Sequence, residues 1–292
     1  MAVKLTPKGL SLNSRKVKIP NGKRNVKALV LTPLDPKPNA AGVLYIHGGG
    51  HVTGMKEMVY MSRAVDMVER YGAIVIAPGY RLAWTAPYPE GLTDCYATLL
   101  WMRDHAEELG INPSQLMVSG ESAGGGLAIA TCLLARDRNE VNIAYQMPIY
   151  PMIDNLDTDS SRDNHNKVWD TKKNHLAWKL YLRKSARFED ASPYAAPARE
   201  TNYTGLPPAY SFVCTGDPFY KETISYIDAL RDAGVHAEID VYEGFYHAFD
   251  LFEDDAPETK LAIERCNQHF EWALENCFAD QPILSDNSSN TI

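Results

Sequence analysis

Short apolar runs alternate with longer helical patterns along most of the chain, and this alternation constrains the fold more than any other feature. Seven runs are predicted to be strands, at residues 26–32, 43–46, 73–77, 116–119, 143–150, 210–214 and 238–242. A period near 3.6 predicts helices at residues 58–70, 93–109, 127–135, 223–232 and 259–278. Strands that alternate with helices of this length indicate an α/β fold, with a mostly parallel central sheet and helices on both faces.

One segment, residues 152–208, breaks this rhythm because it contains no convincing strand. It begins with polar residues, continues with an aromatic helical pattern through Trp178 and Tyr181, and then becomes proline-rich. A loop of that length without structure is unusual in a compact domain. We therefore expect a single domain over residues 1–292, with residues 152–208 as a small cap or lid inserted after about the sixth strand. The small, polar residues near the C-terminus predict a loose tail at residues 280–292.

The pentapeptide GESAG at residues 120–124 matches G-x-S-x-G, in which a serine stands on a sharp turn between a strand and a helix. Glycines at the flanking positions remove the Cβ atoms that would clash in such a turn. The alternative is a glycine-rich turn without a chemical role. The apolar strand before the motif and the apolar helix after it favour Ser122 as a nucleophile.

A second glycine-rich motif, HGGGH at residues 47–51, follows an early predicted strand. Consecutive glycines allow backbone N–H groups to converge on one point, where they can stabilise an oxyanion. The alternative is a flexible surface loop, but the presence of G-x-S-x-G in the same chain favours the oxyanion role. We expect His47 to be structural and to orient this loop.

A serine hydroxyl needs a general base, and the order expected on this kind of fold is serine, acid, histidine. The histidines after Ser122 include His165 and His175 in the predicted cap, His236 before a strand and His269 within a helix. The remaining one, His247, lies just past the last predicted strand. Loops at the carboxyl ends of strands form the ligand-binding edge of an open α/β sheet, so His247 is predicted to be the base.

The acid is predicted by the same positional argument. Asp217 follows the strand at residues 210–214 directly, at its carboxyl end. Asp154 also follows a predicted strand and is the main alternative. Asp250 is too close to His247 in sequence to orient it comfortably. The spacing therefore favours Asp217, whose alternative role is that of a helix N-cap on the surface.

Together these motifs resemble the hormone-sensitive lipase-like family of carboxylesterases within the α/β-hydrolases. The resemblance extends from about residue 26 to residue 273, and its carriers are HGGG, YRLA, GESAGG, GDP and GFYHAF at residues 47–50, 80–83, 120–125, 216–218 and 244–249. It implies an α/β-hydrolase fold, with Ser122 as nucleophile, Asp217 as acid and His247 as base. It also implies that the oxyanion donors are the backbone N–H groups of Gly49, Gly50 and Ala123.

The chain departs from the family pattern at two positions. His51 stands where the family usually has an aromatic residue after HGGG, and Trp84 begins a changed segment where Pro-Glu usually follows YRLA. We expect these two residues to line the substrate pocket, together with Trp169 and Tyr181 of the predicted cap. Few residues precede the first strand, so the cap should come mainly from residues 152–208 and leave a more open site.

The motifs predict a serine carboxylic ester hydrolase that acts on short-chain acyl esters through an acyl-enzyme intermediate. An amidase, such as an aryl formamidase or a peptidase, could use the same triad. A non-catalytic ligand-binding homologue is the third alternative, because a fold does not by itself determine function.

Charge and composition exclude several other classes. A formal net charge of -8 argues against a general nucleic-acid binder and against an anionic membrane surface as partner. The N-terminus lacks a signal-peptide pattern, so we expect a cytoplasmic protein. The five cysteines form no C-x-x-C pair, which argues for reduced structural thiols and against a zinc site. We expect no cofactor, no metal and a small-molecule ester as partner; the sequence leaves homo-oligomerisation open.

Overall fold

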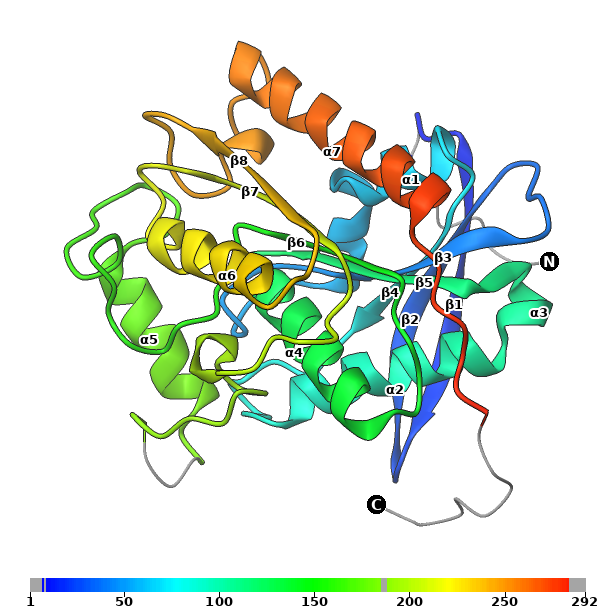
Figure 1. The fold of residues 1–292 in the computed structure, drawn as a ribbon, viewed down its shortest axis with the longest axis horizontal. Helices are drawn as coiled ribbons and strands as arrows, with labels where there is room; N and C mark the ends of the chain where they lie inside the picture. Colours follow the sequence, from blue (N-terminus) through cyan, green and yellow to red (C-terminus); the bar gives the residue numbers. More distant parts are fainter. Residues whose placement is uncertain (1–6, 8, 185–187, 284–292) are drawn as a thin grey trace.

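A computed structural model describes residues 7, 9–184 and 188–283 as a twisted eight-stranded sheet with helices on both faces (Figure 1). The order of the strands across the sheet is β1-β2-β4-β3-β5-β6-β7-β8. The strands are β1 (Leu12–Asn21), β2 (Arg24–Pro33), β3 (Ala40–Ile46), β4 (Ile74–Gly79), β5 (Ile111–Glu121), β6 (Tyr145–Ile149), β7 (Ala209–Cys214) and β8 (Ala237–Tyr242). All seven predicted strands are present, and β1 extends the sheet at its N-terminal edge.

The sheet is parallel from β4 to β8 and antiparallel at its other edge. β1 pairs antiparallel with β2, and β2 pairs antiparallel with β4, whereas the pairs among β3 to β8 are all parallel. The carboxyl ends of the parallel strands therefore lie at one edge of the sheet, where binding sites of open α/β sheets form. This topology confirms the predicted α/β fold with a mostly parallel sheet.

Two apolar cores fill the two faces of the sheet, because successive side chains of a strand point to opposite faces. On β3, Leu44 and Ile46 belong to one core, whereas Val43 and Tyr45 belong to the other. The first core is covered by α2 (Glu90–Asp104), α4 (Ala123–Arg138) and α6 (Tyr220–Asp232). The second is covered by α1 (Ala64–Glu69) and α7 (Pro257–Asn276), on the upper side of the sheet in Figure 1.

The prediction of one continuous helix at residues 58–70 is wrong. The chain forms a 3₁₀ helix, η1 (Lys56–Met61), and then α1, with a break at Ser62. The Ser62 hydroxyl donates to the Val59 carbonyl and accepts the Ala64 N–H, so it competes with the backbone bonds that would continue a helix. Similarly, the helix predicted at residues 93–109 is divided into α2 and the short α3 (Ala106–Leu109).

The segment between β6 and β7 contains one α-helix, α5 (Thr171–Tyr181), and a short 3₁₀ helix, η2 (Pro197–Arg199). The Asp170 side chain caps α5 by accepting the Lys173 N–H. Trp178 and Tyr181 of α5 pack with Ala123 of α4 in a third, smaller apolar cluster. α5 therefore lies over the start of α4, close to Ser122, and at the left of the molecule in Figure 1.

The C-terminal segment is not loose where the structure describes it. Gln281 donates to the carbonyl oxygens of Pro113 and Asn142, at 2.9 Å each, so the predicted tail is held against the body of the protein at this point. The rest of that prediction, residues 284–292, lies outside the described residues. No helix in the described part of the chain is long and apolar enough to cross a membrane.

Candidate active site

The turn from β5 into α4 holds Ser122 in a strained backbone conformation. Its φ of 56° and ψ of -122° lie in a region that non-glycine residues rarely adopt. A Cβ atom on Gly120 would lie 2.5 Å from the Gly124 carbonyl oxygen, and one on Gly124 would overlap the Ile46 carbonyl oxygen. Glycine at both positions therefore allows the tight turn that presents the Ser122 hydroxyl at the carboxyl edge of the sheet.

Three side chains far apart in the sequence form one hydrogen-bonded chain at this edge. His247 Nε2 lies 2.9 Å from Ser122 Oγ, and His247 Nδ1 lies 2.7 Å from Asp217 Oδ2. Asp217 follows β7 and His247 follows β8, so neighbouring parallel strands place them side by side. The structure thus brings together the residues that the sequence predicted as nucleophile, acid and base, in the geometry that a base needs to accept a serine proton.

The histidine and the aspartate are held from several sides. The Asp217 Oδ1 accepts the Phe219 N–H at 2.8 Å, so both carboxylate oxygens have a partner. The His247 ring meets the edges or faces of Tyr150 and Phe219 at centroid distances of 5.0 and 4.9 Å. Asp217 is fully buried and His247 is 3% exposed, which excludes water from the bond between them. This packing limits the ring of His247 to one orientation.

The HGGGH loop lies beside Ser122. A Cβ on Gly48 would lie 3.3 Å from Ser122 Cβ, so the loop approaches the serine closely. Gly49 and Gly50 have positive φ of 115° and 59°, which glycine adopts without strain. Among the backbone hydrogen bonds between described residues outside the helices and strands, none uses the N–H of Gly49, Gly50 or Ala123. These three N–H groups remain available to a ligand.

His47 has the structural role that the sequence suggested. Its ring stacks on Tyr80 at a centroid distance of 4.3 Å, and its Nδ1 lies 2.8 Å from the Gly48 carbonyl oxygen. The Tyr80 hydroxyl donates to the His47 carbonyl oxygen at 3.0 Å. The start of the glycine loop is therefore fixed to the segment that follows β4.

A hollow of about 250 Å³ opens beside Ser122. Its walls are mostly apolar and come from the glycine loop, η1, the segment after β6 and the segment after β8. The lining residues are Gly48, Gly49, Gly50, Thr53, Met58, Glu121, Ser122, Tyr150, Val168, Trp169, His247, Ala248, Leu251 and Phe252. A hollow of this kind, with a few polar groups among apolar walls, is typical of a site for a small organic ligand.

Of the four predicted pocket residues, Trp169 alone lines this hollow. Its ring covers Gly50 so closely that a Cβ on Gly50 would overlap it. His51 and Tyr181 are instead stacked on each other at 3.9 Å and buried behind the loop. Trp84 is 55% exposed and does not line the hollow, so the prediction that it lines the substrate pocket is wrong. Periodicity and motif position gave no indication of whether these rings face the site or the interior.

His51 is buried without a polar partner. Neither of its ring nitrogens makes a hydrogen bond with any residue that the structure describes. Burial lowers the pKa of His51 to about 3, so the ring is neutral near neutral pH. It therefore acts as an aromatic packing residue against Tyr181, and not as the polar pocket group that the sequence suggested.

The two alternative acids are engaged elsewhere. Asp154 forms an ion pair with Arg199 at 2.5 Å. Asp250 accepts the Tyr150 hydroxyl at 3.0 Å and lies 3.9 Å from an Arg63 nitrogen. Neither aspartate contacts His247 through a hydrogen bond that competes with Asp217. The structure therefore favours Asp217 over both alternatives.

A buried carboxyl next to Ser122 was not among the predicted site residues. Glu121 is 5% exposed, lines the hollow and accepts a hydrogen bond from the Tyr45 hydroxyl. Burial, with the nearby Asp250, raises the pKa of Glu121 to about 7, although Tyr45 and Arg63 act in the opposite direction. Its position beside Ser122 in the motif was the available signal, but burial of its side chain depends on contacts with distant strands.

Metal ligands do not cluster in the described part of the chain. No group of three or more His, Cys, Asp or Glu side chains there could hold a metal ion. The five cysteines are all buried and unpaired, as their spacing suggested.

Comparison with known proteins identifies the family. A family model described as an α/β-hydrolase fold matches residues 43–251. Carboxylesterase NlhH of Mycobacterium tuberculosis is 30% identical to this chain, over 84% of the chain and 77% of that protein. Ethyl acetate hydrolase of Pseudomonas putida is 28% identical, over 80% of the chain and 75% of that protein.

A solved structure agrees with these relatives. A bacterial heroin esterase superposes with a TM-score of 0.87 at 35% identity, and the match covers 90% of this chain and 85% of the other. The family model and this superposition agree with the α/β fold described above. The chain therefore belongs to the hormone-sensitive lipase-like carboxylesterases of the α/β-hydrolase superfamily.

Proposed function

We propose that this protein hydrolyses short-chain carboxylic esters through an acyl-enzyme formed on Ser122. His247 Nε2 takes the hydroxyl proton while Ser122 Oγ attacks the ester carbonyl carbon. The negative charge that develops on the carbonyl oxygen is stabilised by the N–H groups of Gly49, Gly50 and Ala123. His247 then returns the proton to the departing alcohol, and Asp217 stabilises the charged imidazole between these steps.

Hydrolysis of the acyl-enzyme repeats the sequence with water as the nucleophile. His247 takes a proton from water, the hydroxide attacks the acyl carbon, and the bond to Ser122 Oγ breaks as the serine regains its proton. The observation that carries the proposal is the hydrogen-bonded chain from Ser122 through His247 to the buried Asp217, at 2.9 and 2.7 Å. The available N–H groups beside it support the same chemistry.

The preference for short acyl groups rests on the size of the site. The hollow at Ser122 measures about 250 Å³, and the Trp169 ring limits it directly over Gly50. This is below the range of about 300–1,000 Å³ that is usual for drug-sized ligands. The relative named ethyl acetate hydrolase acts, by its name, on an ester with a two-carbon acyl group, which supports the same size range.

The test compares the wild-type protein with Ser122→Ala on p-nitrophenyl acetate, butyrate, octanoate and dodecanoate. We expect the wild type to prefer acetate or butyrate and Ser122→Ala to lose at least about 10³-fold in kcat. Ser114→Ala, at the opposite end of β5, is the matched control and should keep wild-type activity. Activity of Ser122→Ala at the wild-type level would contradict the assignment, and an optimum at twelve carbons would contradict the size argument.

Two further measurements separate the alternative functions. Faster hydrolysis of a matched anilide than of the ester would indicate an amidase, since the triad serves both reactions. A fluorophosphonate probe should label Ser122 in the wild type, because it reacts with an activated serine. Failure to label it would indicate a non-catalytic binding protein.

A further inference from the structure

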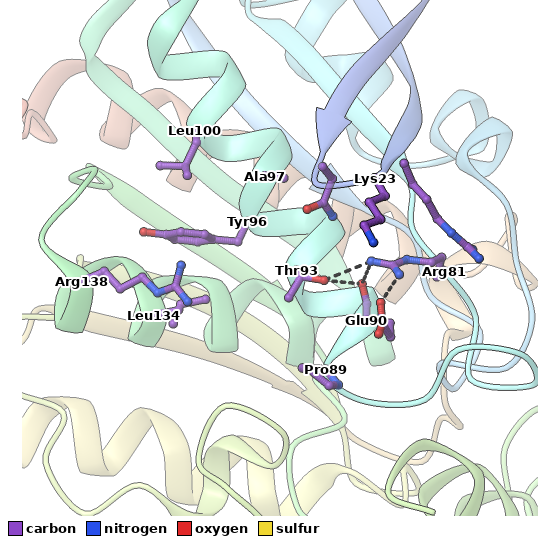
Figure 2. Close-up of a pocket in the computed structure, with 12 residues that line it drawn as sticks. Lys23, Arg81, Pro89, Glu90, Thr93, Tyr96, Ala97, Leu100, Leu134 and Arg138 are labelled. Atoms are coloured by element: carbon purple, nitrogen blue, oxygen red, sulfur yellow. Dashed lines mark hydrogen bonds and ion pairs between the residues drawn. The ribbon is translucent and has the colours of Figure 1, made fainter. Parts of the chain in front are cut away.

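A second hollow, of about 380 Å³, lies where the turn between β1 and β2 meets helices α2 and α4 (Figure 2). It shares no lining residue with the hollow at Ser122. Its volume is within the range of about 300–1,000 Å³ that is usual for small-molecule sites. The reaction proposed above uses no residue of this second hollow.

The two ends of the second hollow differ in chemistry. Figure 2 shows Tyr96, Leu100 and Leu134 gathered at one end, where they form an apolar wall from α2 and α4. Arg138 also lies at this end, but its guanidinium packs over the Tyr96 ring at 5.1 Å and lies 3.8 Å from a Glu140 oxygen. Lys23 and Arg81 lie at the other end (Figure 2). The lining therefore favours a ligand that is apolar over one part and anionic at the end where Lys23 lies.

The polar end is rigid, because the hairpin turn is tied to α2. Gly22, with φ 57°, allows the tight two-residue turn between Asn21 and Arg24, which pair across the hairpin. The Asn21 side chain donates to Asp94 at 2.7 Å. This bond fixes the tip of the hairpin, and with it Lys23, beside the first turns of α2.

Arg81 is not free to bind an anion. It forms two hydrogen bonds to Asp94, at 2.8 and 2.9 Å through its side chain, and one to Glu90. A further bond of 3.2 Å reaches the Thr93 hydroxyl, as Figure 2 shows. Its charge and its donors are therefore occupied by two carboxylates.

Lys23 and Arg24 are the unpaired cations of this site. Both are exposed, and neither side chain has an ion pair or hydrogen bond with another described residue. The formal net charge of the protein is -8, yet this hollow presents two cations without a carboxylate partner. The carboxylate of Glu90, although paired with Arg81, disfavours ligands with several negative charges.

We propose that this hollow binds a small amphipathic monocarboxylate. Its carboxylate is held by Lys23 and Arg24, and its compact apolar body packs against Tyr96, Leu100 and Leu134. Charge complementarity favours this ligand over a neutral one, because only the carboxylate gains contacts with the two exposed cations. The site is separate from the ester site, so it survives even if the proposed esterase reaction is wrong.

The test follows backbone amide resonances of the full-length ¹⁵N-labelled protein during titration with 4-phenylbutyrate. We expect saturable shifts at Lys23, Arg24, Ala97 and Leu100, which identify this hollow directly. The neutral 4-phenylbutan-1-ol and the cationic 4-phenylbutylamine should bind several-fold more weakly, because two charge contacts are lost. Shifts confined to residues that line the hollow at Ser122 would overturn the proposal.

Charge-reversal variants test the role of the two cations. Lys23→Glu combined with Arg24→Glu should weaken binding of 4-phenylbutyrate by about tenfold or more, whereas Lys179→Glu combined with Lys260→Glu makes the same charge change elsewhere and should leave it unchanged. All four side chains are exposed, so both double variants should remain folded, which their unfolding temperatures check. Equal affinity of 4-phenylbutyrate for the two double variants would overturn the proposal. So would amide shifts at Lys23 and Arg24 that change with protein concentration in the absence of 4-phenylbutyrate, because they would indicate that a second copy of the chain occupies this surface.

Discussion

Replacing Glu121 by Gln should change how the stability of the protein depends on pH. Burial raises the pKa of Glu121 from 4.5 to about 7 in the folded protein. Between these two values the carboxyl is protonated when folded and ionised when unfolded, so the free energy of unfolding falls as the pH rises from about 4.5 to about 7. At 1.36 kcal/mol per tenfold change in proton affinity, the loss is about 3 kcal/mol.

Glutamine remains neutral at every pH and retains an oxygen that can accept the Tyr45 hydroxyl. The stability of Glu121→Gln relative to wild type should therefore rise by about 3 kcal/mol between pH 4 and pH 8. Because the protein has 292 residues, this corresponds to about 5 °C in unfolding temperature. Taking the difference between variant and wild type removes the contributions of titrating groups that do not interact with Glu121.

Thermal unfolding at half-unit pH intervals, followed by circular dichroism, measures this difference. Glu275→Gln is the matched control, because it makes the same chemical change at an exposed position on α7. Parallel curves for wild type and Glu121→Gln across this pH range would refute the reasoning. Such a result would mean that Glu121 is ionised to the same extent in the folded and unfolded protein.

Four further changes test the site. Asp217→Asn should lower kcat by about 10⁴-fold with little change in KM, measured on p-nitrophenyl acetate, because His247 loses the carboxylate that orients it; a loss below tenfold would contradict this role. Trp169→Ala should raise the ratio of octanoate to acetate hydrolysis by about tenfold, because it enlarges the hollow; an unchanged ratio would show that another wall sets the limit. Gly50→Ala should lose activity, and adding Trp169→Ala should restore part of it, because the new Cβ overlaps the Trp169 ring. If activity does not recover in the double variant, the loss comes from the backbone conformation at residue 50 and not from this overlap. His51→Phe should stabilise the protein increasingly as the pH falls from 6.5 towards 3, because the unfolded state of the wild type gains a proton there that the buried ring does not; unfolding temperatures that shift equally at pH 5 and pH 8 would contradict this.

Much of the sheet could be predicted because the signals are local. Strands covered on both faces are continuous apolar runs, and their period distinguishes them from the helices between them. The break at Ser62 was not predicted, because the sequence does not show whether a serine hydroxyl forms hydrogen bonds with the neighbouring backbone or points to solvent. Apolar periodicity indicates which residues seek the interior, but it does not detect competition for backbone hydrogen bonds.

The three residues of the candidate triad could also be predicted from the sequence. Ser122 lies in a motif of five consecutive residues that is recognisable in the sequence, and Asp217 and His247 each follow a predicted strand. The carboxyl ends of neighbouring parallel strands lie at one edge of the sheet. The position of each residue directly after a strand was therefore sufficient to predict that they lie close together.

Tertiary structure decided which side chains face the site and which are buried behind it. His51, Trp84 and Tyr181 all looked like pocket residues, yet two of them stack in the interior and Trp84 is exposed. Glu121 is a carboxyl beside Ser122 in the sequence, but its raised pKa follows from burial and from groups on distant elements. The physical reason is the same in each case: the solvation and neighbours of a side chain depend on residues far away in the sequence, which no local pattern records.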